Sequence, residues 1–224
     1  MLFLVMSVPT ILLHPALYQA TVQPVTTNEK TNSSGEALAA LNQLAVKGRA
    51  PKTGYSRSQF GQGWSVVNGC DTRNIILQRD MKNAAMNEAC QVVSGTLADP
   101  YTGKTIDFKR GADTSSLVQI DHVVALSNTW QTGAQQLTSA QREALANDPL
   151  ELLAVDGKAN QEKSDGDAAT WLPSNKSFRC QYVARQIAVK PSNRLWFSPP
   201  KKKRKAHLWG PCFRKVLPKT ECLA

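Results

Sequence analysis

The stretch Leu117–Leu126 constrains the fold most, because it is apolar and β-rich yet carries two adjacent polar residues, Asp121 and His122. A second short apolar run, Leu150–Val155, ends at an Asp-Gly turn, and helical spacing resumes over Ala159–Trp171. We therefore expect a strand, strand, helix unit near the middle of the chain. Neighbouring side chains on a regular strand point to opposite faces, so Asp121 and His122 can share a target only where that strand ends or bends.

Segments on both sides of this unit also have sequence patterns typical of helices or strands. Helical signals mark residues 36–47, 72–90, 138–146 and 175–190, and alternating β-rich residues mark 91–97 and 105–108 around a turn. Thr138 and Gln141 have the spacing of a capping box at the start of a helix. The fold class that we expect is α+β, as a single mostly helical domain with short β-hairpins.

The net charge of the chain indicates which classes of molecule it can bind. Its 224 residues suffice for one domain with a substantial core. Lys and Arg number 27 against 17 Asp and Glu, a net charge of +10 at pH 7. This excess favours polyanionic partners, with nucleic acid first and anionic membrane second.

The two ends differ in composition from the middle. Residues 1–20 are largely apolar and resemble a signal peptide, residues 21–34 form a polar linker, and 35–197 form the folded domain. The tail 198–224 is basic and contains cysteine, and no stretch after residue 20 is apolar enough for a membrane helix. We expect secretion. The run Lys201–Lys205 also resembles a nuclear import signal, so the nucleus is the alternative if residues 1–20 are not a signal peptide.

Five cysteines are present, and none lies in a C-x-x-C pair or at zinc-type spacing. An exported chain would oxidise them. Cys70 and Cys90 are the natural local pair. Cys180 would pair with Cys222 or Cys212, and the sequence leaves the choice open.

Histidine is scarce, which argues against a zinc site built from several histidines. His14 lies in the expected signal peptide and His207 in the basic tail, so His122 is the remaining candidate. Hydrolysis of a phosphodiester needs a base to activate water and a cation to offset charge on the leaving oxygen. Asp121 and His122 offer a cation ligand and a base, although their spacing alone also fits a half-buried structural histidine.

The segment Asp121–Ser127 resembles the start of an HNH (His-Me finger) nuclease motif, and Asp148–Gly157 with Ala159–Asp165 resembles its second strand and helix. The chain is similar to HNH-type secreted proteins related to the C-terminal domain of the GmrSD restriction enzyme. The resemblance covers roughly residues 45–197. Further segments that carry it are Thr53–Arg57, Gly69–Asn74, Gly95–Gly103, Asp167–Pro173 and Tyr182–Gln186.

The resemblance implies a ββα-metal finger inside a nuclease domain spanning 35–197, with His122 as the general base. Asp121 and Asn160 would hold one divalent cation, Mg²⁺ or Mn²⁺, for which oxygen ligands are suited. Lys163 would contact the phosphate. Related domains often carry Asn at the position of Glu151, where it orients the histidine loop, and a carboxylate there can only accept hydrogen bonds.

The expected function is therefore metal-dependent endonuclease cleavage of DNA, and RNA is also a candidate substrate. We expect a monomer with no organic cofactor and no membrane association. Two alternatives remain open at this point. One is a nucleic-acid-binding protein of the same fold that has lost catalysis, with Glu151 as the clue. The other is a secreted cationic protein that binds other polyanions.

Overall fold

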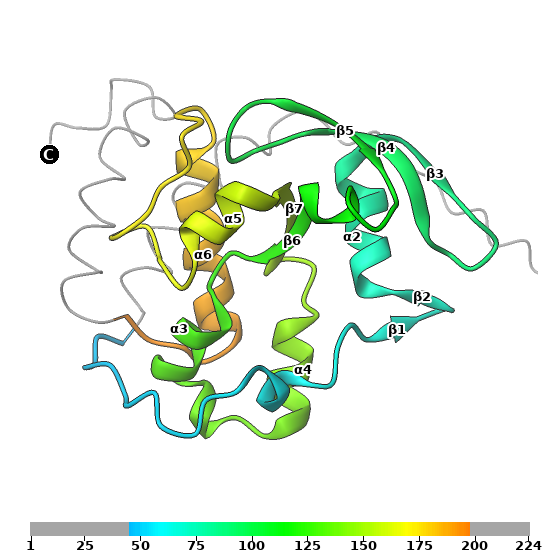
Figure 1. Ribbon diagram of the computed structural model, residues 1–224. Helices are drawn as coiled ribbons and strands as arrows, with labels where there is room; N and C mark the ends of the chain where they lie inside the picture. Colours follow the sequence, from blue (N-terminus) through cyan, green and yellow to red (C-terminus); the bar gives the residue numbers. More distant parts are fainter. Residues whose placement is uncertain (1–44, 198–224) are drawn as a thin grey trace, which may run out of the picture. The chain divides into compact units, whose positions relative to one another are not determined.

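A computed structural model describes residues 45–197. The expected signal peptide, linker and basic tail lie outside the described residues, as does most of the helix expected over 36–47. Within the described part of the chain, no helix is both long and apolar enough to cross a membrane. The described residues form a mixed α+β fold with short antiparallel sheets (Figure 1).

The predicted strand, strand, helix order is present at the centre (Figure 1). Strand β6 (Val118–His122) pairs antiparallel with β7 (Leu152–Asp156), and helix α5 (Gly157–Lys163) follows directly. The side chain of Asp156 caps α5, because its carboxylate accepts a hydrogen bond from the backbone N–H of Ala159. His122 is thus the last residue of its strand, where the pairing ends.

A helical insertion separates the two strands. It contains α3 (Leu126–Gln131), the 3-10 helix η3 (Ala134–Gln136) and α4 (Ser139–Ala146). The predicted capping box is confirmed, since Thr138 accepts from the backbone of Gln141 while the Gln141 side chain accepts from the backbone of Thr138. The insertion matters for the site because the last residue of α4 reaches the ring of His122.

A three-stranded sheet precedes the hairpin. Its order is β3-β4-β5, formed by β3 (Met81–Met86), β4 (Val92–Ala98) and β5 (Thr105–Lys109). The predicted strands over 91–97 and 105–108 are confirmed as β4 and β5, which pair antiparallel. The first part of the described chain holds η1 (Arg57–Phe60), β1 (Val66–Val67) and β2 (Cys70–Asp71).

The helix predicted over 72–90 is confirmed only in its first half. Helix α2 (Thr72–Asp80) begins at the Asp71 cap, but the chain then turns into strand β3. Met81 is buried and pairs with Leu97 on β4, so the sheet partner overrides the helical spacing of the later residues.

Two further helix boundaries differ from those expected. The helix predicted over 159–171 is the short α5, which ends where Ser164 adopts a left-handed φ of 50°. The helix predicted over 175–190 is α6 (Arg179–Ser192). Gly157 starts α5 against the backbone carbonyl of Ser116, so close that a side chain there would clash.

The central hairpin is buried on both faces. Leu152 and Ala154 on β7 pack with the cluster that contains α2, whereas Leu153 and Val155 pack with the cluster that contains α6. Alternate residues of β7 therefore pack into two separate hydrophobic clusters, one on each face of the hairpin. This double burial holds the end of β6, and with it His122, in a rigid frame.

The predicted disulfide between Cys70 and Cys90 is confirmed, with the two Cα atoms 5.2 Å apart. It ties strand β2, which directly precedes α2, to the turn between β3 and β4. Cys180 is also disulfide-bonded. Its expected pairing with Cys222 or Cys212 lies outside the described residues.

Replacing Cys70 and Cys90 together by Ser is expected to lower the free energy of unfolding by about 3 kcal/mol, because the bond closes a loop of 20 residues. Urea unfolding of the two proteins measures the difference. Adding a reductant to the double variant separates this bond from that of Cys180. An unchanged unfolding midpoint in the double variant would contradict the expectation.

Candidate active site

The imidazole of His122 is held in one orientation. Its Nε2 atom lies 3.0 Å from the backbone carbonyl oxygen of Ala146, at the end of α4. A carbonyl only accepts hydrogen bonds, so Nε2 carries the proton in the neutral ring and Nδ1 carries the lone pair. The indole of Trp64 stacks on the same ring, with centroids 5.8 Å apart and planes 6° from parallel. His122 therefore presents Nδ1 as a fixed proton acceptor.

Burial and a nearby cation keep this ring neutral. The side chain is only 6% exposed. Loss of hydration, followed by the positive charge of Arg57, lowers the pKa of His122 from 6.5 to about 3. The hydrogen bond to Ala146 acts in the opposite direction without restoring the ordinary value. At neutral pH the ring is uncharged, which is the form that can remove a proton.

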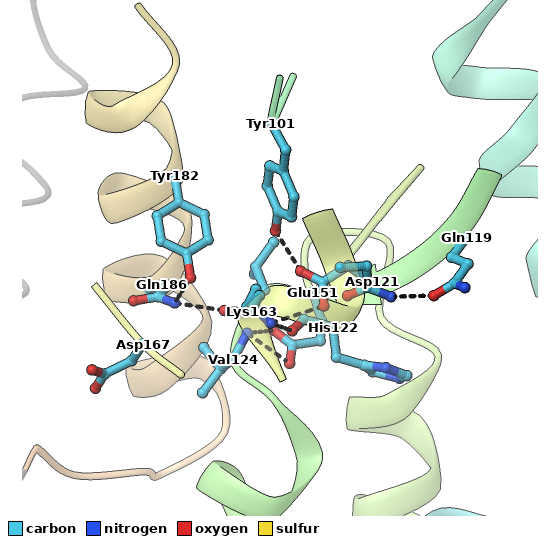
Figure 2. A network of polar contacts seen from close by, with 12 residues as sticks. Tyr101, Gln119, Asp121, His122, Val124, Glu151, Lys163, Asp167, Tyr182 and Gln186 are labelled. Atoms are coloured by element: carbon cyan, nitrogen blue, oxygen red, sulfur yellow. Dashed lines mark hydrogen bonds and ion pairs between the residues drawn. The ribbon is translucent and has the colours of Figure 1, made fainter. Parts of the chain in front are cut away.

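Asp121 points away from this ring and into a buried polar network (Figure 2). The ammonium of Lys163 donates to Asp121 Oδ1 at 2.8 Å and to the backbone oxygen of His122 at 2.9 Å, and the hydroxyl of Tyr101 donates to Asp121 Oδ2. Burial raises the pKa of the Asp121 carboxyl, while Lys163 and Tyr101 lower it. The carboxylate is thus fixed from two sides.

The position of Lys163 corrects one expectation. Its side chain is 2% exposed, and its ammonium lies between two oxygens of β6. A buried ammonium with these partners does not reach a phosphate at the surface, so the predicted phosphate contact is wrong. Spacing along α5 placed Lys163 on the same side as Asn160 but could not reveal that the lysine ammonium is buried against β6.

Asp121, His122 and Asn160 nevertheless border one cavity of about 550 Å³. Asn160 lies on α5, and its Nδ2 donates to Gln119 Oε1 at 2.9 Å. Because the amide nitrogen is used in this way, the Asn160 Oδ1 atom remains available as an acceptor. The structure thus gathers the two predicted cation ligands and the predicted base around a single polar space.

These donors fit a small divalent cation. Among residues 45–197 there is no cluster of three or more His, Cys, Asp or Glu side chains suited to a metal. The protein oxygens on offer come from Asp121, whose carboxylate has lone pairs beyond the two already used, and from Asn160. Two protein oxygens completed by water and phosphate match the coordination of Mg²⁺ or Mn²⁺.

Glu151 supports the segment that follows His122. The residue is fully buried, and both of its carboxylate oxygens accept from the backbone N–H of Val124, at 3.2 and 3.3 Å. Its backbone carbonyl accepts from Val123 as well. Gln186 on α6 donates to the Val123 carbonyl at 2.6 Å. The turn after β6 is therefore clamped from two directions, and burial raises the pKa of the Glu151 carboxyl well above its ordinary value.

Four residues of the site were not predicted. Gln119 could have been found, because it lies two positions before Asp121 and so shares its face of β6. Tyr101 and Arg57 lie in segments that carry the family resemblance, but neither was assigned a role. Nothing in the sequence marked Trp64 as a site residue, since only the folded chain brings its indole against His122.

Residues 71–208 match the family described as "GmrSD restriction endonucleases, C-terminal domain". The chain is 38% identical over 174 residues to an "Uncharacterized secreted protein" of the fungus Arthroderma benhamiae, covering 76% of this chain and 82% of that protein. No solved structure is significantly similar to the chain. The name of the relative and the disulfide of the described domain confirm the expected secretion.

Proposed function

Because the chain belongs to the family of GmrSD restriction endonuclease C-terminal domains, we propose that it is a secreted, metal-dependent nuclease with His122 as its general base. One observation carries the proposal. The His122 ring donates through Nε2 to the Ala146 carbonyl, which leaves Nδ1 to accept a proton, and His122 lines one cavity together with Asp121 and Asn160. A histidine with a purely structural role would not require the carboxylate of Asp121 and the amide of Asn160 at the same cavity.

The chemistry follows from the roles of the side chains. Nδ1 of His122 removes a proton from water, the resulting hydroxide forms a bond to the phosphorus of a phosphodiester, and the P–O bond to the leaving oxygen breaks. Asp121 and Asn160 would hold a divalent cation, which would offset negative charge on the phosphate and the leaving oxygen. Lys163 and Tyr101 position the carboxylate of Asp121. In this arrangement β6, β7 and α5 form the ββα-metal finger.

The substrate that we propose is DNA, with RNA as a further candidate. The net charge of +10 favours a polyanion. A long polymer also suits a site that opens as a polar cavity at the surface rather than as a closed apolar pocket.

Glu151 does not favour the inactive alternative. The argument for lost catalysis was that Glu151 stands where related domains often carry Asn, and that an ionised carboxylate cannot donate a hydrogen bond as an amide can. Its contact with the loop is nonetheless made by accepting from the Val124 backbone, which a carboxylate does well. The support that the histidine segment needs is present, so catalysis remains the better proposal.

The purified protein is expected to nick supercoiled plasmid with Mg²⁺ or Mn²⁺ and to stop when EDTA is added. Asn160→Ala should raise the metal concentration needed for half-maximal cutting by about 10- to 100-fold, the range typical for loss of a supporting metal contact. Asn160→Asp keeps an oxygen ligand and is the matched control. DNA binding without cutting under any divalent metal would overturn the proposal.

A further inference from the structure

Arg57 is an exposed cation at the edge of the site. It is the first residue of η1, and it lines the 550 Å³ cavity together with Asp121, His122 and Asn160. It also lines a second cavity of about 250 Å³, whose wall includes His122 and Trp64. Arg57 therefore stands at the border of two spaces that meet at the candidate base.

The backbone around Arg57 is held in place by contacts of the residues before and after it. Tyr55 and Phe60 flank it in sequence, and their rings pack against Trp130 at centroid distances of 6.2 and 6.3 Å. Arg142 on α4 donates to the backbone oxygen of Gln59 at 2.8 Å. The turn is thus a fixed platform, and a cation on it is presented at a defined place.

The guanidinium of Arg57 itself has no fixed partner in the part of the chain that the structure describes. Within residues 45–197 it makes no hydrogen bond and no ion pair, whereas the ammonium of Lys163 is matched by Asp121. Asp165 lines the same cavity, but its carboxylate accepts from Ser127 and forms no ion pair with Arg57. Lys52, the other cation of this cavity, lies over the ring of Tyr55. An unmatched guanidinium beside a polar cavity is suited to an external anion, and its fork of donors fits phosphate oxygens.

We propose that Arg57 binds a backbone phosphate of the substrate at the border of the two cavities, the role that the sequence suggested for Lys163. The inference rests on the proposed nuclease function and names a substrate-binding residue for it. The polynucleotide then lies across η1 with one phosphate on Arg57 and the reacting phosphate next to His122. Binding depends on Arg57, whereas the proton transfer depends on His122.

The test compares Arg57→Ala and Arg57→Lys with Arg49→Ala, which removes the same charge from an exposed position that borders neither cavity. Binding of a fluorescent DNA oligonucleotide is measured in EDTA at several salt concentrations. Arg57→Ala should weaken binding by about 10- to 100-fold, as for loss of a charged hydrogen bond. The slope of log affinity against log salt should fall by about one, and Arg57→Lys should keep the slope while losing part of the affinity.

The outcomes separate the inference from the function on which it rests. If Arg57→Ala binds with the wild-type slope while the wild type cuts plasmid, the inference fails and the nuclease function stands. If the slope falls but the wild type cuts under no metal, the phosphate contact stands and the nuclease function fails. An equal loss in Arg49→Ala would also overturn the inference, because general charge would then explain the effect. Thermal unfolding of each variant confirms that its fold is intact.

Discussion

His122→Ala is expected to lower the rate of phosphodiester cleavage by about 10²- to 10⁴-fold, the contribution typical of a general base. The ring is neutral at pH 7 because burial and Arg57 lower its pKa to about 3, and its Nε2 proton is committed to the Ala146 carbonyl. Removal of the ring takes away the Nδ1 lone pair without touching Asp121 or Asn160. Cleavage should fall while DNA binding and the metal requirement stay close to those of the wild type. Single-turnover cutting of a labelled duplex measures this loss.

Added imidazole provides the control for this variant. The alanine leaves space between Trp64 and the end of α4, and a free imidazole in that space can supply the missing base. Partial recovery of cutting in His122→Ala, with none in the wild type, would separate loss of the base from damage to the fold. Full activity of His122→Ala without imidazole would end the proposal for this residue.

Lys163→Met is expected to lower the free energy of unfolding by about 3–5 kcal/mol, the cost typical when one partner of a buried ion pair is removed. The ammonium has two acceptors, Asp121 Oδ1 and the His122 backbone oxygen, and the side chain is almost fully buried. Methionine fills a similar volume but leaves Asp121 with an unmatched charge. Urea unfolding followed by circular dichroism measures the change.

Two comparisons make this prediction specific. Lys158→Met removes an exposed lysine from the same helix, and its effect should stay within about 0.5 kcal/mol. Adding Asp121→Asn to Lys163→Met removes the stranded charge, so the double variant should regain part of the lost stability. If Lys163→Met unfolds like the wild type, or Asp121→Asn restores nothing, the buried pair does not have the role assigned to it.

Local signals in the sequence were reliable where near neighbours decide the structure. The capping box of α4 depends on two residues of one helical turn, and the β4–β5 hairpin depends on two strands joined by a single turn. Each was predicted with nearly correct bounds. Helix ends were less predictable. Strand β3 replaced the second half of an expected helix because Met81 found a buried partner in Leu97, and that pairing cannot be seen in the segment itself.

The amino-acid sequence by itself determined which residues could act: one histidine within a strand, a carboxylate beside it, and an amide early in the following helix. Only the tertiary structure decided where each of them points. Asp121 turns inward to Lys163 while the ring of His122 turns to the Ala146 carbonyl, and Arg57 rather than Lys163 lies exposed at the edge of the cavity. The physical reason is that strand geometry assigns a side chain to a face, whereas its charge partner and its access to solvent come from segments far away in the chain.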